Sequence, residues 1–260
     1  MNEDLKSCCA TLYESDFARL LLGDSFHPGG QRLSRRVGEK LNLRAGLRVL
    51  DVASGKGESA IFLAQSFGCE VIGIDFGREN VKDATSRASE AKITHLVSFR
   101  RADAEKLDFP NAGFDAVICE CAFCTFPDKP AAASQFARVL RPGGGVGLSD
   151  LTRSTTLPPE LTGLLAWISC IADARPVEEY AAYLRSAGIS GIEIEPHDEA
   201  LAEMVRDIQG KLLSAELMSK LLKVDLEGVD FAQAKTLARA AADAVRAKTL
   251  GYAIIVGQRT

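Results

Sequence analysis

An apolar run, a glycine turn and a segment of helical composition follow one another in Val49-Leu50-Asp51-Val52-Ala53-Ser54-Gly55-Lys56-Gly57-Glu58-Ser59-Ala60. Gly55 and Gly57 lie at the turn, where the lack of a Cβ lets the backbone fold tightly and approach a ligand. Asp75 ends the next apolar run, at the distance downstream where an acidic side chain can receive ribose hydroxyls. Together these residues predict a nucleoside pocket.

The residues in and around the turn indicate which kind of nucleoside ligand the pocket would bind. A Gly-x-Gly turn alone also fits a plain strand-to-helix connection. A dinucleotide site needs a third glycine, with pyrophosphate at the helix N-terminus, but Ala60 occupies that position. Asp51 begins the loop with a carboxylate, which favours a cationic or hydroxylated ligand over pyrophosphate.

Apolar runs of strand length alternate with helix-length segments, which is typical of a parallel sheet covered on both faces. We expect strands at residues 47–53, 70–75, 97–100, 114–121, 145–150, 189–196 and 252–257. Helices are expected at residues 57–67, 79–91, 129–140, 158–171 and 176–187, with an N-terminal helical segment at 5–43 and a helical insertion at 199–249. Arg141-Pro142-Gly143-Gly144 is expected to end the third of these helices.

These elements predict a single domain over residues 1–260. It would comprise an N-terminal helical cap (1–43), a ligand-binding core (44–151), substrate-side helices with the sixth strand and the insertion (152–251), and a terminal strand (252–260).

The chain resembles the class I S-adenosylmethionine-dependent methyltransferases. The matching motifs are Asp51 to Gly57, Asp75, Ala102-Asp103-Ala104-Glu105, Phe114 to Ile118 and Leu140 to Gly144. The resemblance implies a doubly wound, mostly parallel, seven-stranded Rossmann-like sheet whose last strand is antiparallel. It also implies S-adenosyl-L-methionine as cofactor.

The same resemblance implies roles for individual residues. Asp51 and Gly55 would line the methionine part of the cofactor, and Asp75 would hold the ribose. Asp103 and Ala104 would flank the adenine. The remaining expected cofactor-binding residues are Ala53, Gly57, Phe76 and Cys119. Ala53 departs from the family, which often has glycine there, and its methyl group should tighten the pocket without closing it.

Cysteines gather at the carboxyl end of the fourth expected strand, in Cys119-Glu120-Cys121-Ala122-Phe123-Cys124. Ligands of open α/β sheets bind at this edge. In an extended chain, Cys119 and Cys121 would project to one face and Glu120 to the other. Buried cysteine also acts as a small apolar residue, the interpretation preferred for Cys69 and Cys119 and left open for Cys124.

A narrower resemblance concerns the segment from Val117 to Lys129, with its Pro-Asp-Lys helix start, and Ser169-Cys170-Ile171-Ala172. Both are similar to the arsenite methyltransferase branch. This resemblance assigns Cys121 and Cys170 as catalytic metalloid ligands, with Cys124, Cys119, Cys8 and Cys9 as further candidates. Trivalent arsenic is thiophilic, and its lone pair carries no proton, so its methylation needs no general base.

Two other functions remain open at this stage. A small-molecule O-, N- or S-methyltransferase would share the cofactor site, with Glu120 or His27 as a polar orienting group and the thiols as pocket lining. His27 could equally cap a turn. A zinc-binding or regulatory module would instead use four thiolates, from Cys119, Cys121, Cys124 and Cys170.

Composition limits the partners. The 260 residues carry 31 Lys and Arg against 35 Asp and Glu, a net charge of -4, so the clustered basic excess of a nucleic-acid binder is absent. No apolar run reaches the length of a membrane span, and the acidic start is unlike a signal peptide, which together predict a cytoplasmic protein. We expect a small-molecule or metalloid substrate. The 199–249 helices are expected to form a lid, the surface of a homodimer, or both.

Overall fold

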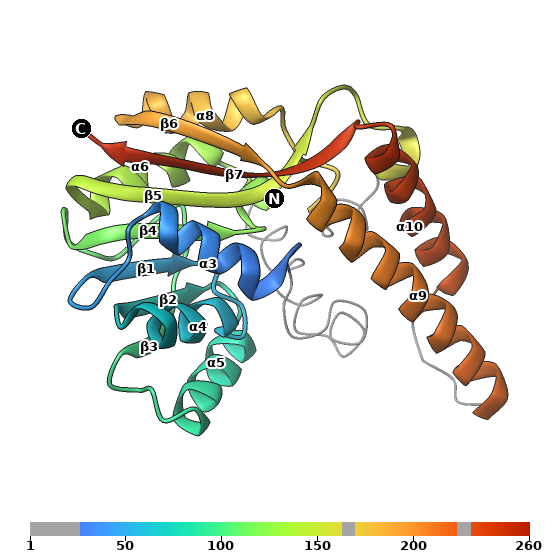
Figure 1. The fold of residues 1–260 in the computed structure, drawn as a ribbon, viewed down its shortest axis with the longest axis horizontal. Helices are drawn as coiled ribbons and strands as arrows, with labels where there is room; N and C mark the ends of the chain where they lie inside the picture. Colours follow the sequence, from blue (N-terminus) through green and yellow to red (C-terminus); the bar gives the residue numbers. More distant parts are fainter. Residues whose placement is uncertain (1–26, 163–169, 223–229) are drawn as a thin grey trace.

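The structure is a computed structural model that describes residues 27–162, 170–222 and 230–260. Its centre is a seven-stranded sheet in the order β3-β2-β1-β4-β5-β7-β6 (Figure 1). The strands are β1 (Arg48–Val52), β2 (Glu70–Asp75), β3 (Val97–Arg101), β4 (Phe114–Glu120), β5 (Leu140–Arg153), β6 (Ile189–Pro196) and β7 (Leu250–Arg259). The first five pair in parallel, and β7 runs antiparallel to both β5 and β6. The predicted fold class is confirmed.

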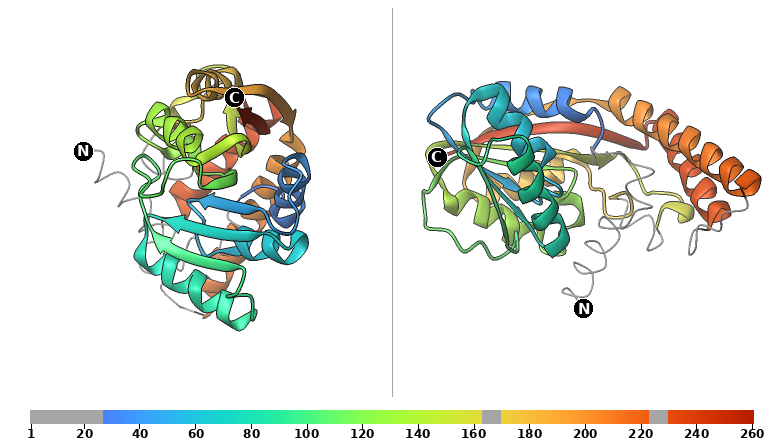
Figure 2. Two further views of the ribbon diagram at one scale, coloured as in Figure 1. Left: turned by 90° about the vertical axis from the view of Figure 1, so that its left-hand side faces the viewer. Right: turned by 90° about the horizontal axis from the view of Figure 1, so that it is seen from below.

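Helices follow the strands as the alternating pattern predicts. They are α3 (Gly30–Lys40), α4 (Glu58–Phe67), α5 (Arg78–Glu90), α6 (Lys129–Val139), α8 (Val177–Ser186), α9 (Asp198–Leu222) and α10 (Phe231–Arg246). Helix α3 packs beside α4, and α6 packs beside α8. The left view of Figure 2 shows α3 and α4 on one side of the sheet and α6 on the other. Both faces of the parallel sheet are therefore covered, as its apolar strands require.

Two expected helices need comment. The described start of the helix expected at residues 158–171 is a 3-10 turn, Pro159–Leu161, and residues 163–169, which make up half of the expected span, lie outside the described residues. Helix α6 ends at Val139, and Arg141-Pro142-Gly143-Gly144 belongs to the start of β5. These residues stop the helix by entering the next strand directly, with no loop between.

Helices α9 and α10 form the insertion expected between the last two strands. They pack along each other and extend away from the sheet (Figure 2, right). Lys235 on α10 pairs with Glu216 on α9 at 2.7 Å. Three large apolar side chains stay exposed near the far end of α9: Leu213, Leu217 and Met218.

Gly57 is required by both its backbone and its surroundings. Its φ of +80° is a left-handed conformation, and a Cβ there would lie 2.5 Å from Phe99 Cζ and 2.9 Å from Ala84 Cβ. We expect Gly57→Ala to lower the free energy of unfolding by about 3 kcal/mol, combining backbone strain with overpacking. Urea unfolding measures this.

Gly46→Ala is the matched control for Gly57→Ala. Gly46 has a φ of +83° but nothing within 4 Å of an added Cβ. It should therefore show the backbone cost alone, about 1 kcal/mol. Equal losses in the two variants would contradict the packing argument.

Candidate functional site

The glycine loop lies at the carboxyl end of β1, where strand order reverses between β2 and β4. Open α/β sheets bind ligands at such a switch point. Ala53, Gly55 and Gly57 all have positive φ, of +58°, +52° and +80°. The family's frequent glycine at the Ala53 position is explained by this left-handed conformation, which alanine adopts here at some cost.

Asp75 ties the glycine loop to the end of β2. One carboxylate oxygen accepts a hydrogen bond from Gly55 N at 2.9 Å, and the other accepts from Gly77 N at 2.8 Å and Asn80 Nδ2 at 3.1 Å. The residue is buried. It therefore fixes the loop conformation at the place where the ribose was expected.

Asp51 presents a buried carboxylate with an unsatisfied oxygen. The residue is 2% exposed, and its Oδ2 has no hydrogen-bond partner. Its pKa is raised well above the usual range, first by burial and then by the charges of Glu120 and Asp75. Such an oxygen fits a cationic group of a ligand, because an unpaired buried carboxylate is costly.

The expected adenine residues lie beside Asp75 at the same edge of the sheet. Ala102 N donates to the Asp75 carbonyl at 3.0 Å, which brings the segment after β3 against the end of β2. Asp103 accepts from Glu105 N at 2.9 Å within this turn, and Ala104 is half-buried. The Arg101 guanidinium lies 5.2 Å from the ring centre of Phe76. The structure thus brings the predicted cofactor residues to one edge.

Glu120 lies at the end of β4 within a polar network that the sequence did not reveal. Ser34 Oγ donates to its Oε2 at 2.9 Å, and Ser149 Oγ donates to its Oε1 at 3.3 Å. His27 Nε2 lies 3.6 Å from Oε2 and also contacts Ser59 Oγ at 3.3 Å. Ser34 stands between Leu33 and Arg35, and Ser149 between Leu148 and Asp150; neither sequence context by itself indicates that these serines share a network.

Three cysteine side chains lie together after the end of β4: those of Cys121, Cys124 and Cys170, which we call the thiol cluster. Cys170 Sγ donates to the carbonyl of Cys121 at 3.2 Å, and its side chain also hydrogen-bonds with the thiols of Cys121 and Cys124. The hydrogen bond with Cys170 and burial raise the pKa of Cys121 well above its usual range. Burial, followed by Cys170, does the same for Cys124. The structure thus brings together Cys121 and Cys170, the two residues that the resemblance assigns as metalloid ligands.

The expected alternation of side chains along the fourth strand fails at its end. Strand β4 stops at Glu120, and Cys121 has a φ of +52°. This turn sends Cys121 towards Cys124 and Cys170, so it does not share a strand face with Cys119.

Among the described cysteines, Cys69 and Cys119 fall outside this cluster. Cys119 and Cys69 are fully buried, as expected of small apolar residues. Cys8 and Cys9 lie outside the described residues. Within residues 27–162, 170–222 and 230–260, no group of at least three His, Cys, Asp or Glu side chains is arranged to hold a metal ion.

Asp150 supports the thiol cluster from β5. Its carboxylate accepts from Cys124 N at 3.0 Å and from Leu151 N at 2.8 Å. Burial, and then the neighbouring Cys170, raise its pKa from 3.8 to about 7. The carboxyl group of Asp150 stays protonated to a higher pH in the folded protein than in the unfolded chain. The free energy of unfolding should therefore fall as pH rises from about 4 to about 7.

Asp150→Asn tests this linkage. The variant has no titrating group at this position. As pH rises through this window, its free energy of unfolding should therefore fall less than that of the wild type, and the difference between the two should reach up to roughly 4 kcal/mol. Urea unfolding of both proteins at about pH 4 and about pH 8 measures the difference. Parallel pH dependence in the two proteins would refute the raised pKa.

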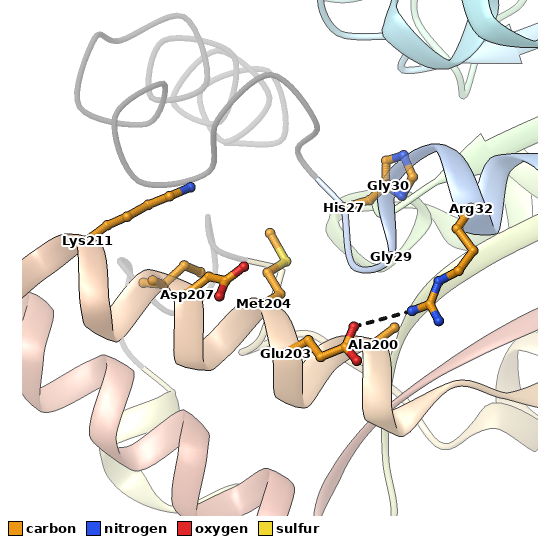
Figure 3. Close-up of a pocket in the computed structure, with 10 residues that line it drawn as sticks. His27, Gly29, Gly30, Arg32, Ala200, Glu203, Met204, Asp207 and Lys211 are labelled. Atoms are coloured by element: carbon orange, nitrogen blue, oxygen red, sulfur yellow. Dashed lines mark hydrogen bonds and ion pairs between the residues drawn. The ribbon is translucent and has the colours of Figure 1, made fainter.

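A cavity of about 310 Å³ lies between the start of α3 and α9 (Figure 3). His27 lines this cavity on one side and contacts the Glu120 network on the other. Asp207 and Met204 point from α9 towards the opening, while Glu203 pairs with Arg32 at 3.3 Å. The cavity is therefore adjacent to the expected methyl-transfer centre.

None of the helices in the described part of the chain has both the length and the apolar character needed to cross a membrane.

Comparison with known proteins gives relatives over most of the chain. The 27-O-demethylrifamycin SV methyltransferase of Amycolatopsis mediterranei (strain S699) is 33% identical over 237 residues, covering 88% of this chain and 83% of that protein. The O-methyltransferase resE of Aspergillus sclerotiorum is 28% identical, covering 88% and 82%. Phosphoethanolamine N-methyltransferase 1 of Zea mays is 31% identical over 72% of this chain but only 37% of its own length.

Solved structures share the fold at low identity. Phosphoethanolamine N-methyltransferase 2 of Haemonchus contortus, in complex with phosphomonomethylethanolamine and S-adenosylhomocysteine, has a TM-score of 0.82 at 18% identity, covering 98% of this chain and 60% of that one. The [4+2]-cyclase SpnF has a TM-score of 0.79 at 22% identity, covering 100% and 97%. A cyclase with this fold shows that the fold alone does not define the reaction.

The family match supplies what the fold alone leaves open. The methyltransferase domain family matches residues 43–188, which contain the glycine loop, Asp75 and the thiol segment after β4. The 33% identity to a named methyltransferase points to the same family. The chain therefore belongs to the methyltransferase domain family and is a class I S-adenosylmethionine-dependent methyltransferase.

Proposed function

We propose that this enzyme transfers the methyl group of S-adenosylmethionine to trivalent arsenic held by Cys121, Cys124 and Cys170. The observation that carries the proposal is the thiol cluster, in which Cys170 contacts a residue 49 positions away in sequence. The cluster follows β4 at the edge of the sheet where the cofactor residues lie.

The cofactor would lie across the carboxyl ends of β3, β2, β1 and β4. Asp103 and Ala104 would flank its adenine, and Asp75 would receive its ribose beside the loop it holds. Asp51 would pair with the cationic methionine end through its unsatisfied oxygen. When bound, S-adenosylmethionine supplies an electrophilic methyl group on a positively charged sulfur.

The thiols would enter the reaction with arsenite in their protonated form. Their raised pKa values keep Cys121 and Cys124 neutral near pH 7. Each As–S bond would form as an As–O bond breaks, and the thiol proton would leave with the hydroxide as water. The thiols now hydrogen-bond within the cluster, so their side chains must rotate to take up arsenic.

Positioning is the main contribution that the protein makes to this reaction. The arsenic lone pair would form the new bond to the methyl carbon as the bond between that carbon and the sulfonium sulfur breaks, and the electron pair of the broken bond would stay on sulfur as neutral S-adenosylhomocysteine. Because the arsenic lone pair carries no proton, no general base is required. Holding the nucleophile in line with the methyl group supplies much of the acceleration.

The direct test is a methyl-transfer assay with labelled cofactor. Arsenite with glutathione is compared with a panel of small phenols and amines. The proposal expects label in methylated arsenic. Label only in a phenol or amine would overturn it. Elemental analysis of the purified protein tests the zinc alternative, which requires stoichiometric zinc.

A second candidate is methylation of a small organic molecule. It is favoured by His27, which joins the cavity beside α9 to Glu120. His27 would then accept the proton of an acceptor hydroxyl, with Glu120 orienting the ring. The names of the relatives also point to organic acceptors, among them 27-O-demethylrifamycin SV. The phenols in the assay above test this candidate.

The partner, domain and location expectations stay predictions. A homodimer would use α9 and α10, where Leu213, Leu217 and Met218 are exposed. A single-domain chain and a cytoplasmic location are likewise proposed.

A further inference from the structure

Glu120 is a buried carboxylate held in a fixed position. Its side chain is only 4% exposed, although it lies at the ligand-binding edge of the sheet. Both oxygens accept from serine hydroxyls, of Ser34 and Ser149, and Tyr252 OH donates in turn to Ser149 Oγ at 3.0 Å. These bonds orient the carboxylate before any ligand arrives.

Glu120 adds negative charge beside Asp51. The charge of Glu120 is the second largest cause of the raised Asp51 pKa, after burial. In the described part of the chain, neither carboxylate pairs with a lysine or arginine, and His27 is the basic group that faces Glu120. Two close carboxylates without a permanent cation favour a positively charged ligand group.

With the cofactor in its proposed position, the layout of the sheet would place one end of it near this pair. Asp103 and Asp75 follow β3 and β2, where the adenine and ribose are proposed to lie. Strand order continues through β1 to β4. A ligand extending along this edge brings its sulfonium and amino groups towards Asp51 and Glu120.

We propose that Glu120 makes the site select for positive charge at the reacting sulfur, so that it binds S-adenosylmethionine more tightly than S-adenosylhomocysteine. The two ligands share the amino group and differ in the sulfonium charge. Charge selection would aid release of the product. This inference rests on the proposed placement of the cofactor and is independent of the arsenic acceptor.

Calorimetric titration without an acceptor tests the inference. Three ligands are used: S-adenosylmethionine, S-adenosylhomocysteine and sinefungin, which carries an ammonium group in place of the sulfonium. In Glu120→Gln the Kd for both charged ligands should rise about tenfold, while that for S-adenosylhomocysteine changes by less than about twofold. Glu120→Asp keeps the charge and should retain most of the preference.

Glu70→Gln is the matched control, because it removes one exposed carboxylate at the start of β2, the opposite edge of the sheet. It should leave all three affinities unchanged. Equal losses for all three ligands in Glu120→Gln would show that Glu120 pairs with the amino group or supports the fold, and would overturn the inference. Unchanged affinities in Glu120→Gln would also overturn the inference. The same holds if the wild-type protein binds S-adenosylhomocysteine as tightly as the charged ligands. Failure of arsenite methylation alone would leave these titrations unaffected.

Discussion

Asp75→Ala should reduce the affinity for S-adenosylmethionine by about 100-fold. The substitution removes the group proposed to receive the ribose hydroxyls. It also removes the acceptor that ties Gly55 N, Gly77 N and Asn80 Nδ2 together. Both the direct contact and the conformation of the glycine loop are lost. Calorimetric titration measures the change.

Two further variants separate these contributions. Asp75→Asn keeps one amide oxygen for the loop but loses the charge. Its affinity for S-adenosylmethionine should therefore lie between that of the wild type and that of Asp75→Ala. Asp243→Ala removes an exposed carboxylate on α10 and should bind as the wild type does. An affinity for Asp75→Ala within about twofold of wild type would refute the ribose assignment.

Cys121→Ser and Cys170→Ser should each lower arsenite methylation by at least about 100-fold. Serine keeps the size of the side chain but replaces a soft sulfur ligand with a hard oxygen, which trivalent arsenic holds far less well. The affinity for S-adenosylmethionine should stay within about twofold, because neither thiol is proposed to bind the cofactor. Product formation and calorimetry are measured on the same protein samples.

Cys69→Ala is the control for the cysteine series. Cys69 is fully buried immediately before β2, outside the thiol cluster, so its replacement should not affect turnover with arsenite. Retained turnover in both Cys121→Ser and Cys170→Ser would remove the metalloid mechanism. It would leave methyl transfer to an organic acceptor as the better explanation.

The sheet was predictable because its signals are local. Apolar runs bounded by glycine and proline mark the strands, and β2 and β6 have the bounds expected from sequence. The glycine loop was predictable for the same reason, since Gly55 and Gly57 adopt the positive φ that only a few residue types tolerate.

The polar network around Glu120 was not predictable in this way. Ser34, Ser149 and Tyr252 come from α3, β5 and β7, and only the folded sheet brings them to one place. The expected shared strand face of Cys119 and Cys121 was wrong because the alternation rule holds only while the chain stays extended, and β4 ends at Glu120. The meeting of Cys121 and Cys170 was predicted from a resemblance, because no local pattern joins residues so far apart.

X-ray absorption at the arsenic edge tests the central claim most directly. The protein is reduced with a phosphine and loaded with arsenite in the absence of small thiols, so that all sulfur ligands come from the chain. We expect three sulfur neighbours and no oxygen neighbour around arsenic, with one sulfur fewer in Cys124→Ser. Arsenic surrounded by oxygen alone, or a sulfur count unchanged in that variant, would contradict the proposed thiol site.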